Sequence, residues 1–330
     1  SDYQGKAHNE RLTQVAAKGF LGKVYLTMAG FPLNDTAKKA EAQQLFKEVI
    51  DYATAKNKYW MADMDAWNQS WLHENDNKYA IFEIQYIAEA GQGNPMVTLT
   101  VPSNPGTDWC GNNLVTGPHV YIERGLQRHF IAKDEITGEY LDKRADGTLN
   151  LKETVNEDGN IVTSEGKTFY TKYFESKVKR AKFGKSDMDA TIVDRTYWPQ
   201  NFQLLRIEDI MLLYAECVGN TTEGRELVNR IRRRAGLADL DINLSEEEFQ
   251  KAVQDERRYE LAEEGVRWFD LVRRNEYVDT IKQMFIDDDD TENGTYKQYA
   301  NRVNADMYLY PIPQSQIEVR KGLYTQNKGY

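Results

Sequence analysis

Residues 256–274, which read ERRYELAEEGVRWFDLVRR, are the most specific part of this sequence. It is dense in charges of both signs. On helices, three glutamates four residues apart form one row, and an arginine lies three residues beyond the last of them: Glu256, Glu260, Glu264 and Arg267. Side chains at these spacings are neighbours on a helix, so an ion-pair lattice is available. We predict that this lattice holds the scaffold together and is not a functional site.

A pair of helices is predicted over residues 245–275. The first helix opens with the capping box Ser-Glu-Glu-Glu, and Gly265 separates it from the second. Trp268 and Phe269 lie in the second helix and are expected to anchor it in the core. Trp268 should therefore be buried, and its role should be structural.

Two further helical pairs are predicted from apolar residues that recur at helical spacing. The first covers residues 11–56, where Gly-Phe-Pro at 30–32 ends one helix and Asn34 or Asp35 can cap the next. The second covers residues 204–236, with a Gly-Asn break between its helices and a glycine at its end. The three pairs should pack on one another. Two-helix units of this kind resemble tetratricopeptide-type hairpins, so the predicted fold class is mainly α.

Residues 57–201 differ in character from the helical pairs around them. They are rich in Gly, Asn, Asp and Thr, they hold five of the six tryptophans, and they carry short extended patches at 79–84 and 168–173. Long irregular segments on a rigid helical scaffold are where binding surfaces usually lie. We therefore expect a loop-rich variable region that carries short strands and contacts a ligand.

Five residues of this region are candidate ligand contacts: Trp109, Asn112, Asn113, Trp67 and Trp71. Trp109 lies among turn-forming Gly, Pro, Asn and Ser residues that cannot build a core around an indole, so the ring either folds back onto the scaffold or is displayed. We expect display, with Asn112 and Asn113 as hydrogen-bonding partners for a sugar or a peptide. Trp67 and Trp71 recur at helical spacing, so core packing and ligand contact are both open for them.

Near-matches to catalytic and metal motifs each fail at a defining position. The Gly-Lys-Thr run that ends at Thr168 lacks the first glycine of a phosphate-binding loop, and Pro95 interrupts a dinucleotide fingerprint. The acidic run Asp287–Asp290 would need a glutamate where Ala300 stands to form a calcium loop. The four histidines form no His-Glu-x-x-His pair. We therefore predict no catalytic residue, no metal site and no cofactor.

The composition excludes several classes of protein. The chain has 330 residues with 42 basic against 52 acidic side chains, and the formal charge of −10 argues against a general nucleic-acid binder. The longest apolar run, Ile210–Ala215, is far short of the roughly 20 residues that span a bilayer. Cys110 and Cys217 are too few for a disulfide framework, and Cys217 is predicted to be a buried small hydrophobic residue.

Four segments of the chain match, in order, the pattern of one family. They are AAKGFLGKVYL at 16–26, LRIEDIMLLYAE at 205–216, the stretch 256–274, and the aromatic ending 308–330. On these segments the sequence resembles the SusD/RagB family of surface nutrient-binding lipoproteins of Gram-negative bacteria. Pro311 and Pro313 hold the backbone extended at the start of this C-terminal segment. We expect the C-terminus to be ordered and packed back on the scaffold.

The resemblance implies a single domain over residues 1–330. The domain would begin with a helical pair at 1–56 and end with further helical pairs and an ordered tail at 202–330. Between them lies a variable ligand region at 57–201. Family members are usually longer at the front, so further helical repeats and a lipidated cysteine are expected before Ser1. That lipid anchor would place the protein on the extracellular face of the cell outer membrane.

The resemblance also implies a function. Family members hold an oligosaccharide, or in some members a peptide, for import by a SusC-like TonB-dependent transporter, and they are not enzymes. We therefore expect a non-catalytic, cell-surface glycan-binding component of a nutrient importer. A peptide-binding component of the RagB type is the alternative, and a hydrolase is a distant third. The expected partners are the ligand and the transporter, with no nucleic acid, and with membrane attachment only through the upstream anchor.

Overall fold

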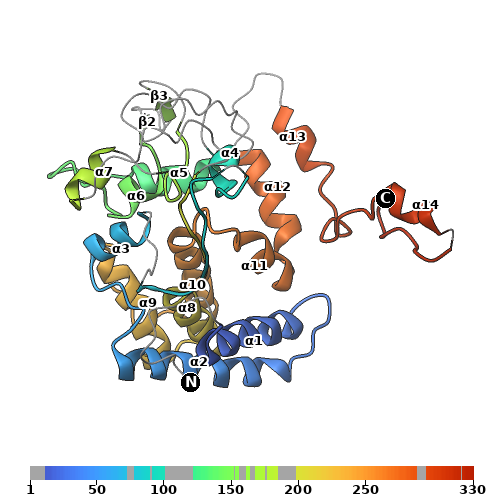
Figure 1. The fold of residues 1–330 in the computed structure, drawn as a ribbon, viewed down its shortest axis with the longest axis horizontal. Coiled ribbons are helices and arrows are strands. Elements are labelled where there is room, and N and C mark those ends of the chain that lie inside the picture. The colour runs from blue at the N-terminus through green and yellow to red at the C-terminus, as the bar shows by residue number, and fades with distance from the viewer. Residues whose placement is uncertain are drawn as a thin grey trace.

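The computed structural model describes most of the chain, and Figure 1 shows its fold. The described residues are 12–72, 78–89, 91–100, 122–151, 153–155, 161–163, 168–174, 177–184, 198–287, 295–320 and 322–330. Within them the helices are α1 (Gln14–Ala29), α2 (Lys38–Lys56), α3 (Met64–Ser70), α4 (Met96–Thr100), α5 (Arg124–Ile131), α6 (Ala145–Thr148), α7 (Lys177–Lys182), α8 (Ile207–Val218), α9 (Thr222–Arg234), α10 (Glu246–Glu260), α11 (Arg267–Arg273), α12 (Tyr277–Asp287), α13 (Thr295–Ala300) and α14 (Gln314–Val319). The strands are β1 (Ala80–Ile84), β2 (Glu153–Val155), β3 (Ile161–Thr163) and β4 (Phe202–Arg206). The described chain is mainly helical, as predicted.

Helices α1, α2 and α8–α11 make up the three predicted helical pairs. Helix α1 packs along α2, α2 packs on α8, and α8 packs on both α9 and α10 (Figure 1). The helices expected over 11–56, 204–236 and 245–275 are therefore confirmed, and so is their packing on one another. The capping box is also present, with the hydroxyl of Ser245 and the carboxylate of Glu248 each bonding the other residue's backbone N–H.

Helix α2 does not begin with the cap that was expected. It starts after Ala37, which has no side-chain oxygen to accept a bond from the first turn. Asn34 instead adopts a left-handed backbone conformation, with φ of 54°, and its side-chain amide donates to the Pro32 carbonyl. Asp35 lies two residues before the capping position. The polar residues after α1 thus build the turn, and the prediction of either one as the cap is wrong.

The main core lies between α1, α2 and helices α8 to α10. Helix α8 is its centre, since every residue from Ile207 to Glu216 is buried. Cys217, predicted to be buried, is half-buried and packs against this core, and burial raises the pKa of its thiol to about 12. Cys110 lies outside the described residues.

A short antiparallel ladder joins the variable region to the core. Strand β1 pairs with β4, with Ala80 opposite Arg206, and β4 runs directly into α8. The extended patch predicted at 79–84 is thereby confirmed. Among the described residues, the patch predicted at 168–173 forms an isolated bridge, Tyr170 to Leu149, and is not part of a ladder. The variable region is therefore attached to the scaffold at β4.

The C-terminal residues form an arm that extends from the body (Figure 1). Tyr308 at its root packs against Phe31, with ring centroids 5.0 Å apart. Beyond it the arm closes on itself, because the side-chain amide of Gln326 bonds both backbone groups of Ile312. Tyr310 is 81% exposed. The expected packing of the C-terminus on the scaffold is therefore wrong, because the described residues beyond Tyr308 make these polar bonds within the arm and Tyr310 is exposed.

Candidate functional site

Helix α10 carries a row of carboxylates that is buried at the centre of the molecule. Three guanidinium groups surround the carboxylate of Glu260: those of Arg206 at 2.7 Å, Arg144 at 2.8 Å and Arg234 at 2.5 Å. Arg144 also pairs with Glu256 at 2.7 Å. The predicted ion-pair lattice is confirmed. Its cations come from β4, from the residue before α6 and from the end of α9, the helix that precedes α10.

Glu264 continues the row into the turn after α10. Its carboxylate pairs with Lys172 and with Arg206, each at 2.8 Å. In the described part of the chain Arg267 forms no ion pair with Glu264, which is already committed to these two cations. The ammonium group of Lys172 also donates to the backbone carbonyl of Glu260 at 2.8 Å. The lattice therefore fastens the extended segment 168–174 to α10.

The electrostatics of the lattice favour a structural role. Burial alone would raise the pKa of Glu260, but Arg234, Arg206 and Arg144 together lower it well below its ordinary value. The group therefore keeps its charge at all physiological pH values. With both of its oxygens bonded to cations, it offers no acid, base or open ligand position for chemistry.

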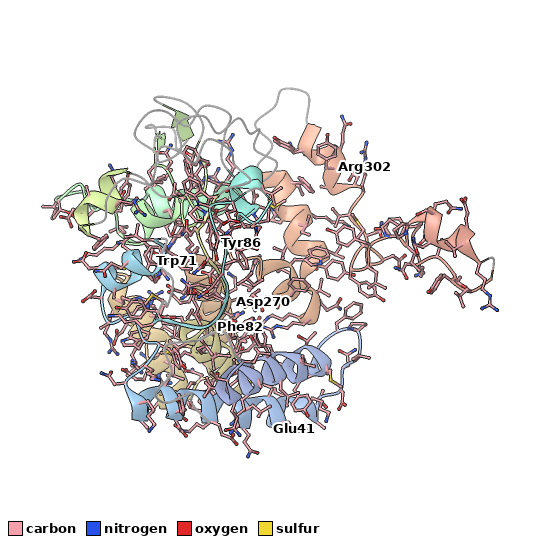
Figure 2. The ribbon with its side chains drawn as sticks, viewed as in Figure 1. Glu41, Trp71, Phe82, Tyr86, Asp270 and Arg302 are labelled. Atoms are coloured by element: carbon pink, nitrogen blue, oxygen red, sulfur yellow. The ribbon has the colours of Figure 1, made fainter. Side chains whose placement is uncertain are left out.

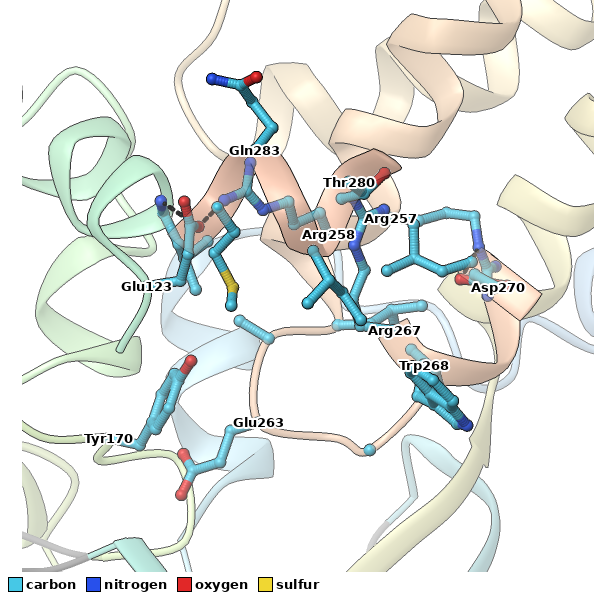
Figure 3. A pocket seen from close by; sticks show the side chains of 18 of the residues that line it. Glu123, Tyr170, Arg257, Arg258, Glu263, Arg267, Trp268, Asp270, Thr280 and Gln283 are labelled. Atoms are coloured by element: carbon cyan, nitrogen blue, oxygen red, sulfur yellow. Dashed lines mark hydrogen bonds and ion pairs between the residues drawn. The ribbon is translucent and has the colours of Figure 1, made fainter. Parts of the chain in front are cut away.

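Beside the lattice, a pocket of about 670 Å³ opens between α5, α12 and the turn after α10 (Figure 3). Apolar side chains form much of its lining: Leu126, Leu261, Val266, Ile281 and Met284. Pockets that bind small molecules are commonly of this size, and they combine an apolar lining with a few polar groups that fix the ligand.

Two aromatic side chains line this pocket, Trp268 and Tyr170. Trp268 is half-buried and meets Tyr277 edge-on, with ring centroids 5.8 Å apart. Phe269 is 67% exposed. The expectation that Trp268 is buried and that Phe269 anchors the helix is therefore wrong. Helix α11 has only seven residues and turns its Leu271 side inward, which leaves the indole on the pocket side and the phenyl ring outside.

Charged and amide groups form the rim of the pocket. Glu123 caps α5, because its two oxygens accept from backbone N–H groups of the first turn at 2.7 and 2.9 Å, and it pairs with Arg258 across the pocket edge (Figure 3). On α12, the side-chain amide of Gln283 donates to Asp287 at 2.7 Å. The rim of the pocket thus carries both hydrogen-bond donors and hydrogen-bond acceptors, and the lining below it is apolar.

Glu263 lies in the wall of the pocket with an unusual environment. It is a non-glycine residue in the left-handed region, with φ of 69°. Its Oε1 is shielded from solvent and has no hydrogen-bond partner among the described residues. Burial raises the pKa of its carboxyl group to about 8, although the nearby Lys172 pulls the pKa down.

Trp67 and Trp71, two of the candidate ligand residues, are core residues. They are 0% and 1% exposed, and Trp71 lies inside the body (Figure 2). The indole N–H of Trp67 donates to Glu260 at 3.3 Å, and a Cβ added to Gly147 would lie 2.3 Å from its ring. Both rings are therefore packed in the interior, where they are shielded from solvent and from a ligand. Of the two readings left open for Trp67 and Trp71, core packing is correct and ligand contact is wrong.

The other three candidate ligand residues, Trp109, Asn112 and Asn113, lie outside the described residues. Sequence reasoning missed Tyr170 and Glu263 as pocket residues and read Trp268 as core. The available signal was the break at Gly265, because several residues of the turn around it line the pocket, whereas no local pattern marked Tyr170.

No metal centre or membrane span is found in the described structure. Within the described ranges, no group of three or more His, Cys, Asp and Glu side chains is arranged to hold an ion. Asp287, the first residue of the acidic run, accepts from Gln283, and the rest of that run lies outside the described residues. None of the helices described combines the length and the hydropathy needed to cross a bilayer.

The model of the SusD family matches residues 31–330, so the chain belongs to that family. Among curated proteins, it is similar to SusD-like protein P38 of Formosa agariphila, with 34% identity over 118 residues, covering 32% of this chain and 22% of the relative. It is also similar to SusD-like protein P25 of the same organism, with 26% identity over 161 residues, covering 46% and 28%. In these matches the chain spans about a quarter of the length of its relatives.

Solved structures confirm the fold. A SusD homologue from Bacteroides thetaiotaomicron superposes with a TM-score of 0.74 at 21% identity, covering 100% of this chain and 66% of that one. Surface glycan-binding protein A from Bacteroides uniformis gives 0.61 at 23% identity, covering 96% and 61%. Surface glycan-binding protein A from B. thetaiotaomicron in complex with laminarihexaose gives 0.65 at 18% identity, covering 96% and 64%. The helical SusD-like fold is therefore the fold of this chain.

Proposed function

We propose that this protein is a glycan-binding component of a nutrient-import system. The observation that carries the proposal is the pocket between α5, α12 and the turn after α10, in which Trp268 and Tyr170 stand beside polar groups over an apolar floor. The C–H-rich faces of a sugar ring pack on aromatic faces, while amide, carboxylate and guanidinium groups bond its hydroxyls. Membership of the SusD family supports the same class of ligand, since two of its structural neighbours are named surface glycan-binding proteins.

A second ligand surface is proposed on the segment that carries Trp109, Asn112 and Asn113. That segment leads in the sequence to Glu123, which caps α5 and forms part of the pocket rim. An extended glycan chain would reach beyond this pocket. We therefore infer that the pocket holds one part of the ligand and that Trp109 contacts another.

The proposed cellular role follows from the family. The protein would hold the glycan for a SusC-like TonB-dependent transporter at the extracellular face of the outer membrane, through a lipid anchor upstream of Ser1, and would not cut it. The buried carboxylates of Glu256 and Glu260 on α10 are committed to ion pairs and are therefore not open to a sugar, as the two carboxyl groups of a glycosidase have to be.

A binding screen tests this function directly. The purified protein is titrated by calorimetry with soluble glycans of several linkages, laminarihexaose among them, and with a set of peptides. Saturable binding of one glycan class, with no release of reducing ends over hours, is the expected result. Saturable binding of peptides alone would replace the proposal by the peptide-binding alternative, and release of reducing ends would replace it by a hydrolase. Co-purification of a TonB-dependent transporter with the tagged protein tests the proposed partner.

A further inference from the structure

Three aromatic rings gather where α13 packs on α12. The ring of Phe285 on α12 has its centroid 6.5 Å from that of Tyr296 and 5.8 Å from that of Tyr299. The centroids of the two tyrosine rings are 6.2 Å apart. Because positions 296 and 299 are three residues apart on α13, their side chains are neighbours on that helix. The three rings therefore form one aromatic cluster.

The two tyrosines of this cluster lie at the surface. Tyr296 is 38% exposed and Tyr299 is 39% exposed, whereas Phe285 is half-buried. Two other side chains anchor the segment: Ala300, which ends α13, and Val303 just beyond it are both buried. Part of each tyrosine ring is thus open to a ligand.

A tyrosine that serves packing looks different in this protein. Tyr277, at the start of α12, is 1% exposed, and its hydroxyl donates to the backbone carbonyl of Ala305. In the part of the chain that the structure describes, the hydroxyls of Tyr296 and Tyr299 have no hydrogen-bond partner. Both hydroxyls are therefore available to bond a group from outside the protein.

A cation lies beside the tyrosines. The guanidinium carbon of Arg302 is 5.4 Å from the centroid of the Tyr299 ring, a distance at which the positive charge is attracted to the ring. Arg302 is exposed, and Figure 2 shows it at the edge of the body. Among the described residues its guanidinium group has no ion-pair or hydrogen-bond partner. The cluster thus carries uncommitted N–H donors next to its two hydroxyls.

This combination of groups fits a carbohydrate. The C–H-rich face of a sugar packs on an aromatic ring, while its hydroxyls exchange hydrogen bonds with phenol hydroxyls and accept them from guanidinium N–H groups. The planes of the two tyrosine rings are 46° apart, so both cannot lie flat on one sugar ring. They can instead contact two residues of a glycan chain.

The cluster is next to the pocket but outside it. Met284 and Asp287 of α12 line the pocket, and Phe285, which lies between them in the sequence, contacts the tyrosines of α13. Figure 1 shows α13 beyond the end of α12. Because the pocket and the cluster both border the C-terminal half of α12, one polysaccharide chain can reach both.

We propose that Tyr296, Tyr299 and Arg302 form an accessory glycan-binding surface, which holds a polysaccharide chain outside the pocket. This inference rests on the proposed function, because it takes the same class of ligand. A chain held at two places rebinds quickly at one while the other stays bound. The accessory surface should therefore raise the affinity for a polymer and leave the affinity for a short sugar in the pocket unchanged.

A polysaccharide and its own disaccharide separate the two surfaces. Laminarin and laminaribiose are the first pair, and pairs of the other linkages in the screen follow. Affinity gel electrophoresis measures retention by the polymer, and calorimetry measures the Kd of the disaccharide. Tyr296→Ala and Tyr299→Ala should each weaken polymer binding by about 3- to 10-fold, with no change for the disaccharide. Arg302→Gln should weaken polymer binding by roughly 2- to 10-fold.

Two further variants control for the loss of a ring. Tyr299→Phe keeps the aromatic face without the hydroxyl, so its polymer affinity should lie between those of the wild type and Tyr299→Ala. Tyr310→Ala removes an exposed tyrosine of the C-terminal arm and should follow the wild type in both assays. Circular dichroism first confirms that each variant is folded.

The outcomes separate this inference from the proposed function. Polymer binding that is unchanged in Tyr296→Ala, Tyr299→Ala and Arg302→Gln overturns the accessory surface, and the proposed function then stands on the wild-type binding. Unchanged polymer binding with loss of transporter co-purification would assign the tyrosines to a protein contact and would also overturn it. If the wild type binds no polysaccharide of the screen, the proposed function fails, and this inference fails with it.

Discussion

Nη1 of Arg206 lies 2.7 Å from Oε1 of Glu260, and both side chains are almost completely withdrawn from solvent. Arg144 and Arg234 reach the same carboxylate, so one glutamate of α10 offsets charge from three other parts of the chain. A buried ion pair contributes little net stability by itself, because desolvation opposes the attraction. Its loss is costly, however, because the remaining charges stay buried. The lattice therefore specifies which segments meet at α10.

The first prediction removes the central charge of this lattice. Glu260→Gln keeps the shape of the side chain but leaves its arginines with one buried carboxylate fewer, so the free energy of unfolding should fall by about 3–5 kcal/mol. Urea unfolding followed by circular dichroism measures it. Glu226→Gln is the matched control, because Glu226 pairs with Arg233 at the surface, where about 0–1 kcal/mol is expected. Equal losses in the two variants would contradict the structural role of the lattice.

The second prediction concerns stability in acid. Burial alone would raise the pKa of Glu216, but Arg273 and Arg274 lower it to about 2 from an ordinary value of 4.5. A carboxyl group with a lowered pKa in the folded state stabilises the protein above its unfolded pKa, and this stability is lost as pH falls toward the folded value. Roughly 3 kcal/mol should therefore be lost between pH 5 and pH 2 through this group.

The matched variant for that prediction is Glu216→Gln. It should be less stable than the wild type at pH 6, and the difference between the two should shrink steadily below pH 4.5. Thermal unfolding at half-unit pH steps records both curves. A difference that stays constant down to pH 2 would show that the carboxyl group of Glu216 is not ionised in the folded protein.

The helical frame could be predicted from the sequence because its signals are local. The capping box at Ser245, the glycine breaks and the apolar spacing over 245–275 act within a few residues of one another. The carboxylate row of α10 could be predicted for the same reason. Its partners could not, since Arg144 lies more than a hundred residues before Glu256 and no local pattern joins them.

The site was harder to predict because a helical pattern does not say which face is covered. Trp67 and Trp268 both lie in short helices with apolar neighbours, yet the first is enclosed by α6 and the lattice while the second borders a pocket. Only the tertiary arrangement decides between them. The exposure of Tyr310 could not be predicted from the sequence for the same reason, because its surroundings depend on the direction that the chain takes after Tyr308.

The third prediction compares these two tryptophans. Trp67→Ala removes a fully buried indole and should lower the free energy of unfolding by about 3–5 kcal/mol. Trp268→Ala removes a half-buried one and should cost only about 1–2 kcal/mol. For a glycan found in the binding screen, Trp268→Ala should weaken affinity, while Trp67→Ala should leave the affinity of the folded fraction unchanged. Urea unfolding and calorimetric titration of the same two variants decide this, and the reverse ranking of affinities would remove Trp268 from the site.

The last prediction concerns Trp109 and the asparagines that follow it. If this indole stacks on a sugar ring, Trp109→Ala should cost about 1–2 kcal/mol of binding free energy, which is roughly a 5- to 30-fold rise in Kd. Trp109→Phe keeps an aromatic face and should recover part of the loss. Asn112→Ala and Asn113→Ala should each cost about 0.5–1.5 kcal/mol if their amides bond hydroxyls. All four variants are titrated with the same glycan after circular dichroism shows that they are folded. Because Trp109 lies among turn-forming residues, an unchanged Kd in all four would mean that this segment folds away from the ligand, and the pocket at Trp268 would then be the whole of the site.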